Sequence, residues 1–189
     1  EPLSEGGGVS VQAGDADDGP PDERAWFGEP GGPAPAQGWL RTRLAAMSSV
    51  GDDTTWVVDS TPVECGRSRE TAQRSDLAGW AEYGYCASHS RYFWGLRLHL
   101  VCTLHGLPIG WALTGAKADE RHALHDILTT TPQLAEACIS LQPTIIGDKN
   151  YYGTVFEAQL AESAITLLRP QRKGEKPRSG QRFFKPLRQ

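Results

Sequence analysis

Residues 92–104 read Tyr-Phe-Trp-Gly-Leu-Arg-Leu-His-Leu-Val-Cys-Thr-Leu, and this stretch decides the fold class. Its even-numbered positions all hold aromatic or apolar side chains, whereas polar side chains such as Arg97 and His99 fall on odd-numbered positions. A period of two over thirteen residues predicts a long β-strand with one buried face, formed by the even-numbered side chains.

Apolar periodicity on both sides of this strand predicts further strands and helices. In chain order we expect a short buried strand at 54–61, an extended loop at 64–90 with a turn of helix near 75–80, the long strand, its hairpin partner at 109–114, a helix at 119–131, a strand at 144–148, a helix at 152–164 and a last strand at 165–168. Locally joined strands followed by alternating strands and helices predict an α/β protein, a mixed sheet with flanking helices. Among such layouts this order matches a ribonuclease H-like core.

Composition divides the chain into three regions. Residues 1–38 contain nine Gly and six Pro without hydrophobic periodicity, which predicts a disordered acidic segment. Residues 39–53 predict a short helix or linker, and residues 54–189 form the expected folded domain. Because no run of about 18 apolar residues occurs, we expect no membrane partner. The four cysteines form no CxxC pair and fit free thiols in a reducing cytoplasm.

Charge is segregated along the chain, which matters more than the net charge of −4. Residues 1–38 hold eight acidic side chains and one basic side chain, whereas residues 169–189 hold eight basic and one acidic. Because nucleic-acid binding depends on the local field, the acidic balance of the whole chain does not exclude a DNA partner.

Two aspartates stand at the ends of apolar strands, Asp59 after Trp-Val-Val and Asp148 after Ile-Ile-Gly. A buried carboxylate is costly unless it is paired or bound to a cation. On neighbouring strands the two would offer hard oxygen ligands to Mg²⁺, which supports phosphodiester chemistry. The alternative is that each aspartate only caps a turn, Asp59 before Ser60 and Asp148 before Lys149.

Several separate motifs, in family order, resemble the catalytic domain of bacterial insertion-sequence transposases of the DDE type. They are Val-Val-Asp-Ser-Thr-Pro-Val-Glu (57–64), Tyr-Gly-Tyr-Cys-Ala-Ser-His-Ser-Arg-Tyr-Phe-Trp-Gly-Leu-Arg-Leu-His-Leu (83–100), Ile-Gly-Asp-Lys-Asn-Tyr (146–151), and Leu-Leu-Arg-Pro (167–170) followed by a basic stretch. The resemblance implies a ribonuclease H-like fold, Mg²⁺ or Mn²⁺ as cofactor, and DNA strand cleavage and transfer in transposition. By motif match Asp59 is the first catalytic aspartate and Asp148 the second, both as metal ligands.

The resemblance also implies a partner, double-stranded DNA at the terminal inverted repeats of the element. It leaves open a homodimer on the DNA, and it implies a cytoplasmic protein at the bacterial nucleoid. We expect DNA contacts from Lys149 and from residues 169–189, named here the basic segment, where phosphate neutralisation would make affinity depend on salt. The alternative is a solvated loop without a partner. The cations of the basic segment are Arg169, Arg172, Lys173, Lys176, Arg178, Arg182, Lys185 and Arg188.

The sequence departs from the family pattern at the third carboxylate, a glutamate that the family carries on a helix beyond the basic loop. No acidic residue follows Glu175, and the sequence stops at Gln189, about where that helix should begin. We therefore expect a domain that is incomplete at its C-terminus and has lost full activity, which leaves its status as an enzyme open.

Two other functions stay open at this point. A non-catalytic remnant that still binds DNA could inhibit an intact transposase. The pairs Cys86-x-x-His89 and Cys102-x-x-His105 could instead bind zinc in a small interaction domain. Against zinc, Cys102 lies on the apolar parity of the predicted strand, and His105, three residues later, would point to the other face.

Overall fold

The computed structural model describes residues 53–86 and 90–184, with the side chain of residue 183 left out. The predicted disorder of 1–38 and nearly all of the predicted linker at 39–53 lie outside these residues. The elements are β1 (Thr55–Gly66), α2 (Arg69–Arg74), β2 (Glu82–Cys86), β3 (Arg91–Thr103), β4 (Pro108–Gly115), α3 (Glu120–Thr130), α4 (Pro132–Leu141), β5 (Thr144–Ile146), α5 (Thr154–Glu162), β6 (Thr166–Leu168) and the short 3₁₀ helix η3 (Gln181–Phe184).

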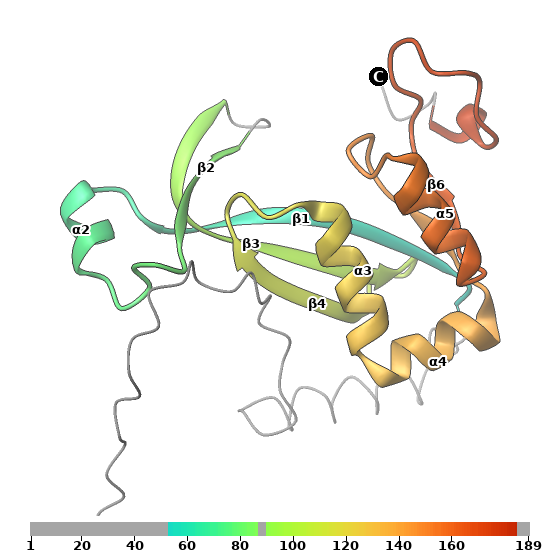
Figure 1. Ribbon diagram of the computed structural model, residues 1–189, viewed down its shortest axis with the longest axis horizontal. Helices are drawn as coiled ribbons and strands as arrows, with labels where there is room; N and C mark the ends of the chain where they lie inside the picture. Colours follow the sequence, from blue (N-terminus) through green and yellow to red (C-terminus); the bar gives the residue numbers. More distant parts are fainter. Residues whose placement is uncertain (1–52, 87–89, 185–189) are drawn as a thin grey trace, which may run out of the picture.

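The strands form one mixed sheet of six strands in the order β2-β3-β1-β5-β6, with β4 also paired to β3 (Figure 1). The pairs that β3 makes with β1, β2 and β4 are antiparallel, whereas β5 is parallel to both β1 and β6. This curled sheet with flanking helices confirms the predicted α/β class and is compatible with a ribonuclease H-like fold.

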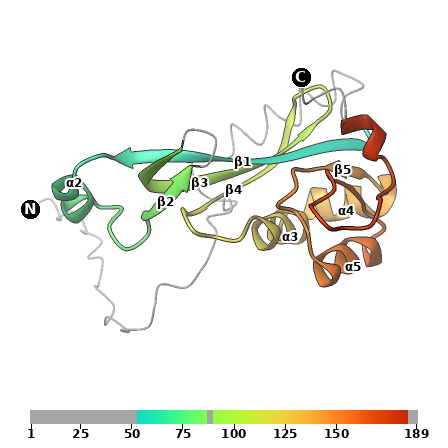
Figure 2. The ribbon, with the colours of Figure 1, turned by 90° about the horizontal axis from the view of Figure 1, so that it is seen from above.

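The main core lies between the sheet and a layer formed by α3, α4 and α5, which lie on one side of the sheet (Figure 2). Its centre contains Trp56 and Val58 from β1, Val101 from β3, and Leu124 and Ile127 from α3, each at most 2% exposed. Burial of such large apolar side chains is the main stabilising contribution to a domain of this size.

The predicted buried face of the long strand is wrong for the second half of β3. His99, Val101 and Thr103, at odd positions, are at most 2% exposed, whereas Leu100 is half-buried and Leu104 is 58% exposed. The helices pack on the odd-numbered face, and its polar side chains are tolerated because they find partners there. His99 lies 2.9 Å from the Thr114 hydroxyl, and the Thr103 hydroxyl accepts a hydrogen bond from a backbone N–H.

The region predicted as an extended loop at 64–90 contains regular structure. Strand β1 continues to Gly66, and α2 begins after Ser68, whose hydroxyl accepts a hydrogen bond from the backbone N–H of Thr71. Strand β2 follows at Glu82–Cys86. Helix α4 was also not predicted. It begins at Pro132, directly after the predicted helix at 119–131, and proline fits the first turn of a helix as well as it ends one.

Candidate active site

The register of two parallel strands brings Asp59 and Asp148 to the same edge of the sheet. Strand β1 pairs with β5 from Thr55 opposite Thr144 to Val57 opposite Ile146. Asp59 and Asp148 each lie two residues beyond that last pair, on chain segments that leave it in the same direction. Neighbouring parallel strands therefore place the two residues at one edge of the sheet.

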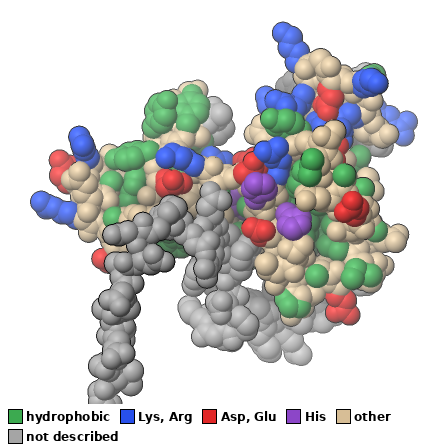
Figure 3. Space-filling model, in the orientation of Figure 1, with side chains coloured by type: hydrophobic (Ala, Val, Ile, Leu, Met, Phe, Trp, Pro, Cys, Tyr) green, Lys and Arg blue, Asp and Glu red, His purple; other side chains and the backbone are tan. Residues whose placement is uncertain are grey.

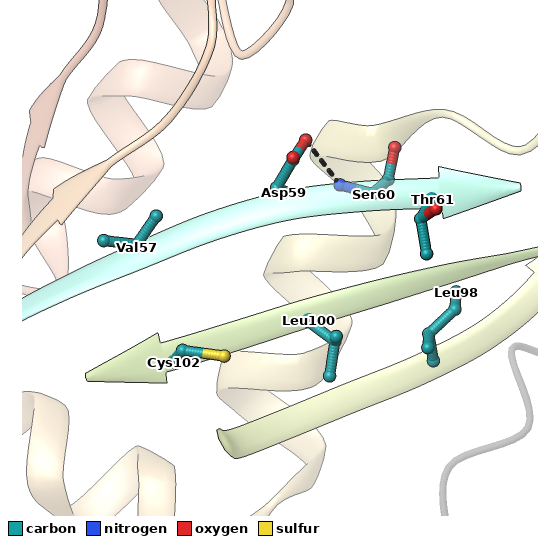
Figure 4. Close-up of a pocket in the computed structure, with 7 residues that line it drawn as sticks. All are labelled: Val57, Asp59, Ser60, Thr61, Leu98, Leu100 and Cys102. Carbon is teal, nitrogen blue, oxygen red and sulfur yellow. Dashed lines mark hydrogen bonds between the residues drawn. The ribbon is translucent and has the colours of Figure 1, made fainter. Parts of the chain in front are cut away.

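Asp59 is an exposed side chain at the rim of a shallow hollow of about 180 Å³. Its Oδ1 accepts a hydrogen bond from the backbone N–H of Ser60 at 2.8 Å, and the carboxylate points away from β3 (Figure 4). The apolar floor of the hollow is formed by Leu98, Leu100 and Cys102 of β3, on the face of the sheet opposite the helices. Asp59 is thus accessible to solvent, and its second carboxylate oxygen, Oδ2, is available to a ligand.

The surroundings of Asp148 disfavour its negative charge. Desolvation by partial burial raises the pKa of Asp148, and the carboxylates of Glu120 and Asp59 raise it further. The backbone N–H of Asn150 donates a hydrogen bond to Asp148 Oδ1 at 2.7 Å, which opposes the rise. Repulsion from the other two carboxylates contributes less to this rise than burial does. A bound cation relieves such repulsion, and this electrostatic setting fits a divalent metal.

Glu120 is a third acidic side chain at this edge, and the sequence analysis missed it. It is the first residue of α3, directly after the N-cap Asp119. Its Oε1 accepts hydrogen bonds from Arg97 Nη1 at 2.8 Å and from the Ser60 hydroxyl at 2.5 Å, and Arg97 Nη1 also donates to Ser60 Oγ at 3.0 Å. The only signal in the sequence was its place at the head of a predicted helix, which does not reveal the neighbouring strand.

Tyr151, three residues after Asp148, is 1% exposed and belongs to the main core. Its ring packs close to Gly147, where a modest side chain would already collide with it. Burial raises the pKa of its hydroxyl, and so do Glu120, Asp59 and Asp148. Among the described residues this buried hydroxyl has no hydrogen-bond partner. The motif Ile-Gly-Asp-Lys-Asn-Tyr contained it, but no chemistry had been assigned to the tyrosine.

The basic segment is divided into internal and exposed cations. Arg169 is 2% exposed, and its Nη2 lies 2.7 Å from Glu157 Oε1 and 2.5 Å from Glu175 Oε1. Arg178 bridges the same two glutamates at 2.7 and 3.3 Å. These two arginines therefore hold the segment against α5.

The other described cations predicted to contact DNA are exposed on the surface. Lys and Arg side chains gather over this part of the molecule (Figure 3). The guanidinium of Arg172 lies 3.5 Å above the ring of Tyr152. Lys185 and Arg188 lie outside the described residues. The exposed cations in the described part of the chain that are predicted to contact DNA are Lys149, Arg172, Lys173, Lys176 and Arg182.

A zinc site finds no support among residues 53–86 and 90–184, which contain no group of three His, Cys, Asp or Glu side chains that could hold a metal ion. Cys86 is buried, and burial raises the pKa of the Cys102 thiol, which favours neutral thiols over metal-binding thiolates. His105 contacts Asp53 at 3.3 Å, and His89 lies outside the described residues.

The family model described as "Transposase DDE domain" matches residues 51–186. Comparisons with curated proteins and with solved structures gave no match. Within the described part of the chain, no helix has the length and apolar character needed to cross a membrane.

Proposed function

Because the chain belongs to the transposase DDE domain family, we propose that its fold serves DNA strand cleavage and transfer in the transposition of a bacterial insertion sequence. Asp59 and Asp148 are the catalytic pair in this proposal. The observation that carries it is the parallel register of β1 and β5, since both aspartates lie two residues beyond its last pair.

Mg²⁺ or Mn²⁺ is the proposed cofactor, with Asp59 and Asp148 as its ligands. The donor type fits, because carboxylate oxygens are the ligands that these hard cations prefer. The pKa of Asp148 is raised first by partial burial and then by the negative charges of Glu120 and Asp59, which a cation would offset. When bound, such ions activate a water or a 3′-hydroxyl and stabilise the leaving oxygen of a phosphodiester. The chain's own contribution is to hold both carboxylates at one edge of the sheet.

The proposed partner is duplex DNA at the terminal inverted repeats, bound by the exposed cations near this edge. Lys149 directly follows Asp148, and Lys173 and Lys176 extend the positive surface. Arg169 and Arg178 support that surface from within by fixing the loop to Glu157 and Glu175. A homodimer on the DNA and a place at the bacterial nucleoid belong to the same proposal.

We further propose that the 189-residue polypeptide binds DNA but does not complete cleavage. Motif matching assigns two carboxylates, whereas cleavage needs cations held in fixed geometry by enough ligands. A longer polypeptide that supplies the family's third glutamate is expected to nick DNA. Without cleavage, the DNA-bound chain would act as an inhibitor of an intact transposase.

The test combines metal binding with cleavage. Mn²⁺ titrations followed by electron paramagnetic resonance should show binding to the unaltered chain, and Asp59→Asn and Asp148→Asn should each abolish it. Asp76→Asn, at an exposed aspartate beyond α2, is the matched control and should bind like the unaltered chain. On DNA with the element ends, only the longer polypeptide should nick. Unchanged Mn²⁺ affinity in both aspartate variants would refute the metal centre.

A further inference from the structure

Tyr152 connects the loop that carries Asp148 with the basic segment. It follows Asp148 by four residues and is 37% exposed. Two hydrogen bonds close the turn between them: the backbone N–H of Asn150 donates to Asp148 Oδ1 at 2.7 Å, and the backbone N–H of Tyr152 donates to the carbonyl of Asn150 at 2.8 Å. A cation of the basic segment that contacts the Tyr152 ring is therefore brought beside the loop of Asp148.

Arg121 fixes the backbone of this loop at Tyr152. Its Nη1 donates a hydrogen bond to the carbonyl of Tyr152 at 3.0 Å. The same guanidinium is paired with Asp119, the N-cap of α3: Nε donates to Oδ1 at 2.9 Å, and Nη2 forms an ion pair with Oδ2. Hydrogen bonding from Arg121 lowers the pKa of Asp119 to about 2, so the pair stays ionised at neutral pH. Arg121 thus holds Tyr152 at the head of α3, and Asp119 neutralises the charge of Arg121.

The guanidinium of Arg172 lies over the ring of Tyr152. Its Cζ is 3.5 Å from the ring centroid, whereas the Cζ of Arg121 is 5.3 Å from it. A separation of 3.5 Å is van der Waals contact, and at that range the negative face of the ring attracts a cation. The backbone N–H of Arg172 also donates a hydrogen bond to Glu175 Oε2 at 2.9 Å. Arg172 is therefore held at both its backbone and its guanidinium.

The N–H donors of Arg172 stay available although the side chain is held. Among the described residues its guanidinium contacts the ring of Tyr152 and has no acidic partner, whereas Arg169 and Arg178 are both paired with glutamates. The donors of a guanidinium match the oxygens of a phosphate in a two-pronged geometry. A side chain that is ordered before binding loses less conformational entropy on contact with its ligand. Arg172 therefore has the properties of a preorganised phosphate contact.

We propose that Tyr152 is a positioning residue of the DNA interface: its ring holds the Arg172 guanidinium where it binds a backbone phosphate of duplex DNA beside the loop of Asp148. Tyr152 acts through Arg172, while Asp119 and Arg121 keep the loop in place. The inference rests on the proposed function, because it requires a duplex on the exposed cations.

Tyr152→Leu tests the positioning role, because leucine lacks the aromatic face. Affinity for a duplex, measured by fluorescence anisotropy, should fall about 2- to 10-fold, since Arg172 must then be ordered during binding. The slope of log K against log salt concentration should stay the same, because the phosphate contact itself remains. Tyr152→Phe keeps the ring and should bind like the unaltered chain. Tyr83→Leu, at a tyrosine that is 53% exposed on β2, is the matched control and should change neither the affinity nor the slope.

Arg172→Ala provides the second arm, because it removes the cation itself. It should weaken binding and lower the magnitude of the salt slope by about 1. In the Arg172→Ala background, Tyr152→Leu should have no further effect on affinity, since the ring then has no cation to hold. An equal loss of affinity from Tyr152→Leu with and without Arg172 would show that the ring acts on the DNA or on the fold by itself, and would overturn the inference.

Arg172→Lys keeps the charge but removes the planar guanidinium. It should weaken binding about as much as Tyr152→Leu, at an unchanged salt slope. Because Arg172 is exposed, this variant decides the question even if Tyr152→Leu fails to fold. If Arg172→Ala weakens binding and neither Tyr152→Leu nor Arg172→Lys does, this inference alone is overturned. If neither Arg172→Ala nor Lys173→Ala weakens binding, the proposed DNA surface is overturned with it.

Discussion

At the scale of single residues, His99 shows how the sheet buries a titratable group. It is 1% exposed beneath the helices, and its Nε2 lies 2.9 Å from the Thr114 hydroxyl. That hydroxyl donates to the carbonyl of Gly115, so it accepts from His99, whose ring is then the neutral tautomer with hydrogen on Nε2. Nδ1 has no partner among the described residues. Protonation would place a second N–H there, without an acceptor.

The fold should therefore lose stability in mild acid through His99. Burial lowers its pKa to about 4, although Glu120 partly opposes this, and in the unfolded chain the pKa returns to its ordinary value of 6.5. As the pH falls below 6.5, the unfolded chain takes up a proton that the folded chain refuses. The free energy of unfolding should fall by about 2 kcal/mol between pH 7.5 and pH 5.

Urea unfolding at the two pH values measures this loss. His99→Asn should lower stability at both, and its loss between them should be smaller than in the unaltered chain by about 2 kcal/mol. His125→Asn, at a partly exposed histidine of α3, should keep the full pH dependence. An equal loss in all three proteins would mean that other groups cause it.

At the scale of elements, four charged side chains fasten the basic segment to α5. Arg169 and Arg178 each contact Glu157, which lies on α5, and Glu175, which lies in the segment. Arg169 is the buried member, so loss of its partners would leave a charge away from water. The glutamates also gain from the pairing, since Arg169 lowers the pKa of Glu175 to about 2.

Arg169→Ala should separate a role in folding from a role in DNA binding. Removal of the buried guanidinium leaves two glutamates without their main partner and should cost about 3 kcal/mol in urea unfolding. Arg172→Ala, at an exposed position in the same segment, should change stability by less than about 0.5 kcal/mol. A stable Arg169→Ala protein with reduced DNA affinity would show that Arg169 acts on DNA directly.

The sequence predicted those elements whose apolar pattern lies within a short stretch of the chain. The hairpin of β3 and β4, the strand before Asp148 and the helix α5 follow from apolar periodicity. Strand β2 was not predicted because its apolar pattern is inverted: the exposed face carries Tyr83 and the buried face carries Gly84. A side chain at Gly84 would meet the Phe93 ring at 2.9 Å. Which face of β3 is buried depends on where the helices pack, and period two alone cannot decide that.

The predicted place of the aspartates is right only for Asp148, which follows the short strand β5, because Asp59 lies within β1, which continues to Gly66. Glu120 was not predictable, because its position depends on α3 lying beside β1, a contact between residues 60 positions apart in the case of Ser60 and Glu120. Likewise, a count of basic residues cannot distinguish the buried Arg169 from the exposed Lys173, since the difference comes from the pairing of Arg169 with Glu157 of α5 and with Glu175 of the same segment.

At the scale of the whole molecule, exposed cations lie at both ends of the sheet (Figure 3). Those predicted to bind DNA come after β5 and β6 in the chain, at the end opposite α2 (Figure 1), whereas Arg67, Arg69 and Arg74 are exposed at the α2 end. The strand edge that carries Asp59 and Asp148 belongs to the region of β5 and β6, because β5 pairs with both β1 and β6. A duplex bound by the cations that follow β5 and β6 would therefore lie near the two aspartates, whereas one bound near α2 would not.

Salt dependence of duplex binding tests this arrangement. With five exposed cations in the described part, Lys149, Arg172, Lys173, Lys176 and Arg182, a plot of log K against log salt concentration should have a slope of about −3 to −5. Each phosphate contact removed should lower the magnitude of the slope by about 1, so Lys173→Ala should weaken binding equally on all sequences. Arg74→Ala, at the end of α2, is the matched control and should leave the slope unchanged. If Arg74→Ala lowers the slope and Lys173→Ala does not, the DNA lies at the α2 end of the sheet, too far from Asp59 and Asp148 for them to act on it.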